Sequence, residues 1–257
     1  EKHLAFQPQR LALAECRPRL PAAKHGHIGV HAQRQPGLNF IGVALPVGRL
    51  GAAQMRGLAD IAGRYGSGTL RLTVWQNLLI SDVPDADLAA AEAAIAALGL
   101  GTSASVIRGA LVACTGNSGC KFALGNTKRH ALDLADRLEA RLALDQPVSI
   151  HLTGCPHSCA QHLVADIGLP ATKVEIGGDM VEGYHICVGG AGGAARRIGR
   201  EIYPAVPFAD VPRQVEKLLG AYLAHRASPA ESFHAFANRH ALDELKRLSE
   251  TAVSRAA

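Results

Sequence analysis

The chain has 257 residues, which is long enough to bury one substantial hydrophobic core or two smaller ones. Its 48% hydrophobic and 19% charged residues exclude an intrinsically disordered protein. No stretch approaches the roughly 18 consecutive apolar residues of a membrane span. The net charge of +5 comes from scattered Lys and Arg residues, without the basic and aromatic stripe of a nucleic-acid-binding surface. We therefore expect a protein that binds neither membrane nor nucleic acid.

The first part of the chain is predicted to be an irregular arm followed by a small α+β unit. Residues 1–26 are predicted to be an arm or linker, because Pro8, Pro18 and Pro21 interrupt any long helix. The pattern that follows predicts strands at 39–45, 69–75 and 78–80 and helices at 51–65 and 85–98. The predicted apolar face of the first helix consists of Met55, Leu58, Ala59, Ile61 and Ala62. This order over residues 27–99 is typical of a ferredoxin-like half-domain.

The second part, residues 100–257, is predicted to form a mixed α/β domain. Its predicted strands are 106–113, 148–152, 165–167, 174–176 and 184–188. Its predicted helices are 121–144, 211–225 and 232–248, the last with a break. The fold class is therefore expected to be α+β, with two units divided near residue 100.

Four of the six cysteines occur as two spaced pairs. Cys114 and Cys120 are separated by five residues, Cys155 and Cys159 by three, and each pair follows a predicted strand. Glycines in these segments leave backbone N–H groups free to face a negatively charged cluster. Two such loops can supply the four thiolates of a [4Fe–4S] cluster. A zinc site remains an alternative, although structural zinc usually has two to four residues between paired cysteines.

The remaining cysteines, Cys16 and Cys187, stand apart from the pairs and are expected to be small buried side chains. The N-terminal residues lack the charged and apolar pattern of a secretory signal, so disulfides are not expected. Reduced cysteines and the absence of this signal favour a cytoplasmic location.

The cysteine segments carry a wider resemblance. The sequences ACTGNSGCKFA (113–123) and TGCPHSC (153–159) resemble the signature of the nitrite/sulfite reductase family. Similar matches are HIGVHAQ (27–33), PVGRL (46–50), YGSGTLRLT (65–73), QN (76–77) and VADIG (164–168). The chain resembles the second half of these enzymes, which consist of two related halves.

This resemblance implies two cofactors. A [4Fe–4S] cluster would be bound by Cys114, Cys120, Cys155 and Cys159, and the sulfur of Cys159 would bridge it to sirohaem iron as the axial ligand. Candidate cofactor-binding side chains are Thr115, Asn117, His157 and Arg71. His157 stands where the family commonly has Asn. The family's substrate-holding Arg and Lys residues come mainly from the first half, so no catalytic side chain is assigned here.

The resemblance also implies the six-electron reduction of nitrite to ammonium, with sulfite reduction to sulfide as the alternative. The segments 126–128 and 164–168 look more like nitrite-type enzymes. No dinucleotide or flavin motif is present, so ferredoxin or another reductant protein is the expected electron donor. Two further alternatives are a domain that only transfers electrons through its cluster, and the related precorrin-modifying chemistry.

Several polar residues permit two interpretations. Arg71, Gln76 and Asn77 at the end of a strand pair would either face the cofactors or be structural. Two interpretations are open for the basic residues Lys121, Lys128 and Arg129. They would support cofactor carboxylates or the docking of the electron donor, or they would form a solvated helix face. Because only the second half is matched, we expect this chain alone to be weakly active or inactive.

Overall fold

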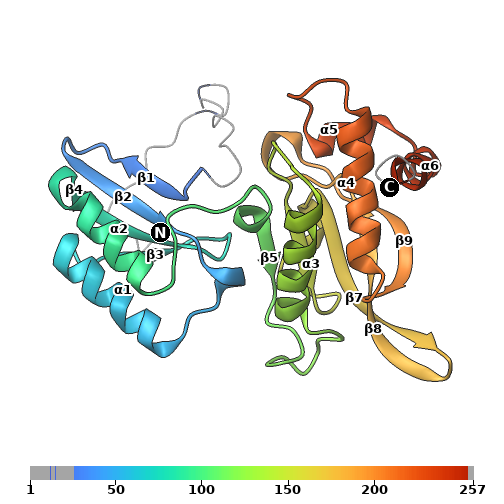
Figure 1. Ribbon diagram of the computed structural model, residues 1–257, viewed down its shortest axis with the longest axis horizontal. Coiled ribbons are helices and arrows are strands. Elements are labelled where there is room, and N and C mark those ends of the chain that lie inside the picture. The colour runs from blue at the N-terminus through green and yellow to red at the C-terminus, as the bar shows by residue number, and fades with distance from the viewer. Residues whose placement is uncertain (1–11, 13–14, 16–25, 254–257) are drawn as a thin grey trace.

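The computed structural model describes residues 12, 15 and 26–253. The predicted arm, with Cys16 and its three prolines, lies outside the described residues apart from 12, 15 and 26. The described chain forms two units side by side, each built on its own sheet and core (Figure 1). The predicted α+β class is confirmed.

The first unit is a four-stranded antiparallel sheet covered by two helices. In spatial order its strands are β1 (Gly29–Ala32), β2 (Leu38–Val43), β4 (Leu78–Pro84) and β3 (Leu70–Leu72). Helices α1 (Ala52–Tyr65) and α2 (Leu88–Ala97) lie side by side over one face (Figure 1). Ile41, Leu58, Ile80 and Ile95 are fully buried between sheet and helices, as a ferredoxin-like half-domain requires.

Two expectations for this unit are wrong. Met55 is 58% exposed and Ala59 is also exposed, so the buried face of α1 is narrower than predicted and consists of Leu58, Ile61 and Ala62. The strand predicted at 69–75 is shortened to β3 because the chain turns at residues 73–76, where the Gln76 N–H donates to Thr73 O. Strand β1 was not predicted; it is only four residues long and lies at the edge of the sheet.

The second unit has a five-stranded mixed sheet. Its strands, in spatial order, are β5 (Leu111–Ala113), β6 (Ile150–Thr153), β7 (Ile167–Ile176), β8 (Asp179–Val188) and β9 (Arg200–Pro207). Strands β5, β6 and β7 run parallel to one another, and β8 is antiparallel to both of its neighbours, β7 and β9. Its helices are α3 (Thr127–Arg141), α4 (Val211–His225), α5 (Phe233–Arg239) and α6 (Leu242–Val253).

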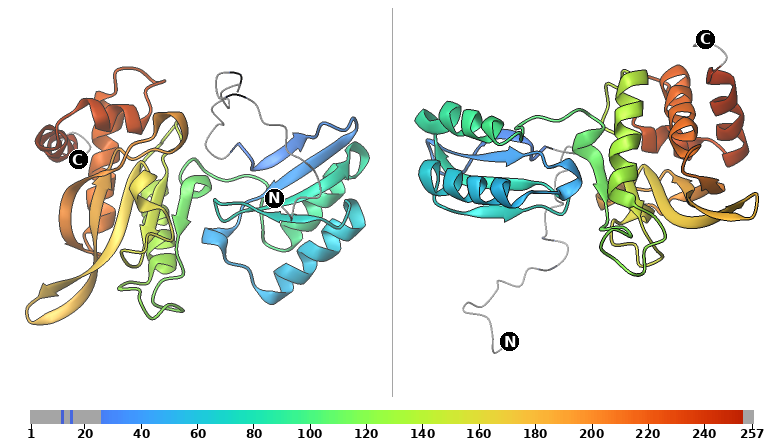
Figure 2. Two further views of the ribbon diagram at one scale, coloured as in Figure 1. Left: turned by 180° about the vertical axis from the view of Figure 1, so that it is seen from behind. Right: turned by 60° about the horizontal axis from the view of Figure 1, so that its bottom comes forward.

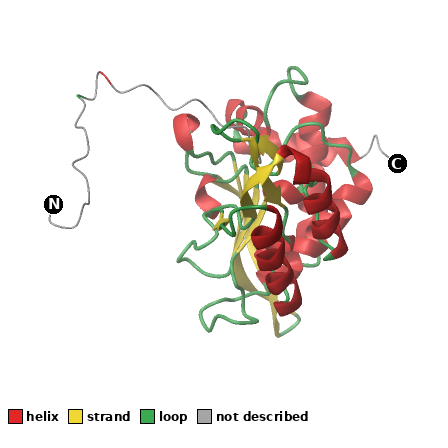
Figure 3. Ribbon diagram, turned by 90° about the vertical axis from the view of Figure 1, so that its left-hand side faces the viewer, coloured by secondary structure: helices red, strands yellow, loops and turns green. Residues whose placement is uncertain are grey.

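Figure 3 shows the larger helices of both units on one side of the strands, and Figure 2 shows α3 beside α4. Leu134 and Leu138 of α3 and Val215 and Leu219 of α4 are fully buried against the second sheet. Short 3-10 helices occur at Pro46–Gly48, Asp85–Asp87, Arg108–Ala110, His162–Val164 and Gly193–Ala195. No helix within residues 26–253 is long and apolar enough to cross a membrane.

Several predicted boundaries of strands and helices in this unit are wrong. The strand predicted at 106–113 is confined to β5, because residues 108–110 form a 3-10 turn. Of the strand predicted at 165–167 only Ile167 belongs to β7, the long strand that also contains the predicted strand 174–176. Strand β9 was not predicted. The predicted helix at 121–144 begins only at Thr127, because the preceding residues fold back in a loop. The break within 232–248 is confirmed between α5 and α6.

Cys187 lies on β8 and is 7% exposed, so its predicted burial is confirmed. Burial, assisted by Glu201, raises the pKa of its thiol to about 11. It is therefore an inert side chain of the core.

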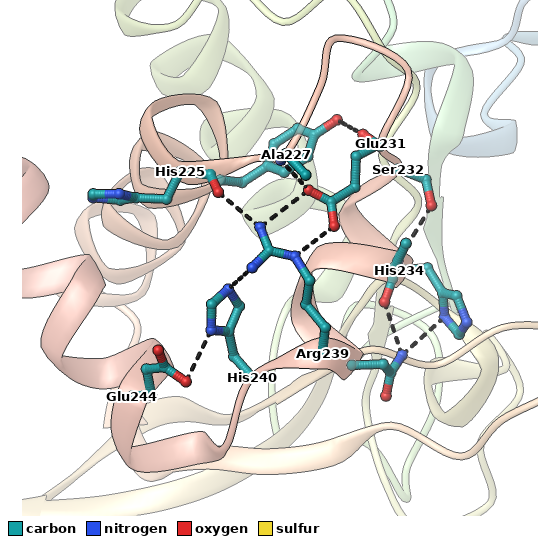
Figure 4. A network of polar contacts seen from close by, with 11 residues as sticks. His225, Ala227, Glu231, Ser232, His234, Arg239, His240 and Glu244 are labelled. Atoms are coloured by element: carbon teal, nitrogen blue, oxygen red, sulfur yellow. Dashed lines mark hydrogen bonds and ion pairs between the residues drawn. The ribbon is translucent and has the colours of Figure 1, made fainter.

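A polar network joins α4, α5 and α6 (Figure 4). The guanidinium of Arg239 donates to Glu231 at 2.6 Å and to the His225 carbonyl at 2.7 Å. It also meets His240 Nε2 at 2.5 Å, and His240 Nδ1 pairs with Glu244 at 2.9 Å. The network satisfies a carbonyl at the end of α4 and fixes the loop that leads to α5.

The core of the second unit provides a stability prediction. Leu138→Ala removes a fully buried side chain and should lower the free energy of unfolding by about 2–5 kcal/mol, measured by chemical denaturation. The matched control is Leu72→Ala, because Leu72 is 82% exposed and its loss should change stability by less than about 0.5 kcal/mol. Equal effects of the two variants would contradict the assigned core.

Candidate metal centre

The two cysteine segments follow neighbouring parallel strands. Strand β5 ends at Ala113, directly before Cys114, and β6 ends at Thr153, two residues before Cys155. Ala113 pairs with Leu152 in parallel register. Because parallel strands end at the same edge of a sheet, both cysteine loops begin side by side.

Direct contacts join the two loops. The Gly154 N–H donates to Cys114 Sγ at 3.0 Å, and the Leu124 N–H donates to the Gly154 carbonyl at 2.7 Å. The rings of Phe122 and His157 meet edge to face at 5.5 Å between centroids. The two loops that carry the cysteine pairs are therefore in direct contact with each other.

Exposure varies among the four thiols. Cys155 is buried, Cys114 and Cys120 are partly buried, and Cys159 is exposed. Within residues 26–253, no three His, Cys, Asp or Glu side chains converge closely enough to bind one metal ion. A site of that kind would be needed for zinc, whereas in a cubane the thiolates bind the different irons of one larger cluster.

The first loop is held against β8 and α3. Glu182 of β8 accepts from the Asn117 side chain at 2.6 Å and from the Asn126 N–H at 2.8 Å. The Thr127 hydroxyl donates to the Cys114 carbonyl at 2.7 Å and lies 3.6 Å from Cys114 Sγ. Sequence reasoning missed Glu182, because it lies far along the chain in a hairpin without a local signal.

The second loop is held by its own polar contacts. Ser158 adopts a left-handed conformation with φ of +56°, and its hydroxyl lies 2.9 Å from His162 Nδ1. The Ala160 N–H donates to the Thr153 hydroxyl at 3.3 Å. Burial lowers the pKa of His162, which favours a neutral ring in this contact. These bonds fix the backbone on both sides of Cys159.

The first unit contacts the strand that carries Cys114. The Gln76 amide donates to the Ala113 carbonyl at 2.7 Å and accepts from the Ala113 N–H at 3.1 Å. Lys128 Nζ donates to the same carbonyl at 2.8 Å and also to the carbonyl of Val47. For Gln76 the structural interpretation therefore holds, and Lys128 lies between the units instead of on a solvated face.

The other candidates occupy different places. Arg71 is exposed on β3, where its charge lowers the pKa of Asp82 after the stronger effects of Ser67 and Gln33. Thr115 and His157 are exposed at the cysteine loops. The Asn77 amide is buried and accepts from the Leu45 N–H at 2.9 Å, which is a structural role.

Comparison with known proteins identifies the family to which the chain belongs. Residues 31–98 match the nitrite/sulfite reductase ferredoxin-like half domain, and residues 106–255 match the nitrite and sulphite reductase 4Fe–4S domain. The chain belongs to the nitrite/sulfite reductase family. This family implies a [4Fe–4S] cluster and sirohaem, and the paired cysteine loops fit the cluster.

Individual relatives carry names of both reductase types. The chain is 43% identical to a ferredoxin–nitrite reductase of Synechococcus elongatus, over 76% of this chain and 38% of the relative. It is 36% identical to a ferredoxin sulfite reductase of Mycolicibacterium paratuberculosis, over 86% of this chain and 40% of the relative. The solved structure of Mycobacterium tuberculosis NirA matches with a TM-score of 0.81 and 34% identity, covering 89% of this chain and 42% of that chain. The chain thus spans about two fifths of these relatives.

The contact between the cysteine loops can be tested at Gly154. A Cβ there would lie 2.6 Å from Ala123 Cβ, so Gly154→Ala should force the loops apart and cost about 1–3 kcal/mol of stability. Gly63→Ala is the matched control, because a Cβ at this helical position meets nothing within 4 Å. That variant should be neutral or more stable. A Gly154→Ala protein as stable as the parent in urea denaturation would refute the close packing.

Proposed function

We propose that this chain is the cluster-bearing part of a ferredoxin-dependent nitrite reductase. The observation that carries the proposal is the pairing of β5 with β6, which brings Cys114 and Gly154 together at one sheet edge. We propose Cys114, Cys120, Cys155 and Cys159 as the four cluster ligands. We further propose residues 27–99 and 100–257 as its two domains, preceded by the arm.

Cys159 is proposed as the sulfur shared by cluster and sirohaem. Its exposure supports this role, because a bridging thiolate must reach a second group outside the loop that carries it. The Ser158–His162 contact orients the backbone beside it. When bound, the two cofactors supply electron storage and a site for reduction of the anion.

The proposed cofactor contacts follow from exposure around the cysteine loops. Thr115 and His157 present side chains to solvent beside the cluster ligands and are retained as candidates. Asn117 is retained as a positioning residue, because its amide already donates to Glu182. Arg71, on β3 of the first unit, is proposed to interact with a cofactor carboxylate.

Nitrite is preferred over sulfite on the resemblance of segments 126–128 and 164–168 and on the ferredoxin–nitrite reductase relative at 43% identity. Sulfite is the second candidate, supported by the sulfite reductase relative at 36% identity. Ferredoxin is the proposed donor and the cytoplasm the proposed location.

The cofactor assignment can be tested on anaerobically purified protein. We expect about five irons per chain, four in the cluster and one in sirohaem, and about four acid-labile sulfides, together with a Soret band and a red chlorin-type band from sirohaem. Replacing any of the four proposed ligands by Ser should remove most of the iron and sulfide. Cys187→Ala is the matched control and should retain both, because Cys187 lies within the core of the sheet. Zinc without sulfide would overturn the assignment.

Substrate choice requires a separate measurement. With reduced ferredoxin or reduced viologen, nitrite should be consumed faster than sulfite, and ammonium should be the product. For this chain alone we expect turnover below about 1 s⁻¹, because the resemblance places the anion-binding basic residues in the other half of the family's enzymes. Faster reduction of sulfite would favour the second candidate.

A further inference from the structure

Lys128 occupies an unusual position for a lysine in the first turn of a helix. It is the second residue of α3, and its side chain is half-buried between the two units. Its Nζ donates to the Val47 carbonyl of the first unit and, at 2.8 Å, to the Ala113 carbonyl of the second. Ala113 directly precedes Cys114. The cationic group is thus fixed beside one of the proposed cluster ligands.

The surroundings suit a fixed positive charge. Both hydrogen-bond partners of Nζ are acceptors, as an ammonium with three donors and no acceptor requires. Burial and Arg49 lower the pKa of Lys128, whereas the proximity of Cys114 raises it. The placement of the ammonium rests on geometry, because its 2.8 Å hydrogen bond to the Ala113 carbonyl holds it at the residue directly before Cys114.

Other groups around Cys114 present partial positive charge to its sulfur. The Gly154 N–H donates to its sulfur at 3.0 Å, and the Thr127 hydroxyl lies 3.6 Å away. Thr127 is also the first residue of α3, and the N-terminus of a helix carries partial positive charge. Lys128 adds a full positive charge at the carbonyl of Ala113, the residue before Cys114.

We propose that Lys128 raises the reduction potential of the iron–sulfur cluster held by Cys114. This inference rests on the proposed cluster, but not on the identity of the anion that the enzyme reduces. In the step concerned, a reductant protein gives up one electron and the cluster gains it, with no bond broken. The reduced cluster is more negative by one charge, so a nearby ammonium stabilises it more than the oxidised form. Lys128 is a positioning and tuning residue, since it acts through the cluster.

The neighbouring cations are not placed to raise the reduction potential of the cluster in this way. Lys121, Arg129 and Arg49 are exposed, and Arg129 pairs with Asp133 at 3.0 Å on the same helix. Charges in solvent are screened by water and salt, whereas Lys128 is held at the buried junction of the units. Arg129 therefore offers a matched control one residue away.

The test is a redox titration of the cluster in the full 257-residue chain, followed by electron paramagnetic resonance. Lys128→Met should lower the equilibrium constant for one-electron reduction roughly tenfold, equivalent to about 59 mV for one electron. Lys128→Arg should restore most of the potential, because it retains the charge. Arg129→Met, which also removes one positive charge, should leave the potential unchanged.

A second variant separates charge from packing. Lys128→Gln retains a hydrogen-bond donor without the charge, so it should reproduce the lowered potential even where Lys128→Met folds poorly. Iron and sulfide analysis of each variant confirms that the cluster is present. If Lys128→Gln and Arg129→Met both keep the parental potential, the tuning role is wrong although the proposed function stands. If the parent chain holds no iron and sulfide, the proposed function fails first and the tuning role fails with it.

Discussion

The parallel pairing of β5 with β6 is the constraint on which the rest of the site depends. It places Ala113 opposite Leu152, so both chains leave the sheet at one edge and carry their cysteines into adjacent loops. The Gly154 N–H on the Cys114 sulfur and the Leu124 N–H on the Gly154 carbonyl join them into one structure. Side-chain bulk at residue 154 would exclude this contact.

The supporting residues come from distant parts of the chain and form hydrogen bonds with the first cysteine loop or with the strand before it. Glu182 fixes the first loop from the β7–β8 hairpin, and Gln76 fixes the strand before Cys114 from the first unit. The geometry of the thiolates is therefore determined by both sheets together. Rigid support of this kind reduces reorganisation when a metal group gains or loses charge.

Local patterns in the sequence carried much of this information. The cysteine spacing and the glycines predicted the paired loops, and periodicity predicted α1 and α4 closely. Boundaries failed where tertiary contacts overrode local propensity. Helix α3 begins only at Thr127, because the residues before it form the first cysteine loop. Leu72 lies in a strand, as its alternating pattern predicted, but its apolar side chain is exposed. Contacts such as Asn117 with Glu182 join residues 65 positions apart, and no local pattern encodes them.

The junction at Gln76 limits how freely the two units can be exchanged between related proteins. Gln76 holds a left-handed backbone with φ of +60°, and its side-chain amide pairs with Ala113 as a neighbouring strand would. A half-domain transplanted from another family member must reproduce both the turn and the amide, or else leave the Ala113 backbone groups without these partners. The two units are thus built on separate sheets but matched at their boundary, where Val47 of the first unit joins the core of the second. Recombination within the family is expected to preserve them as a pair.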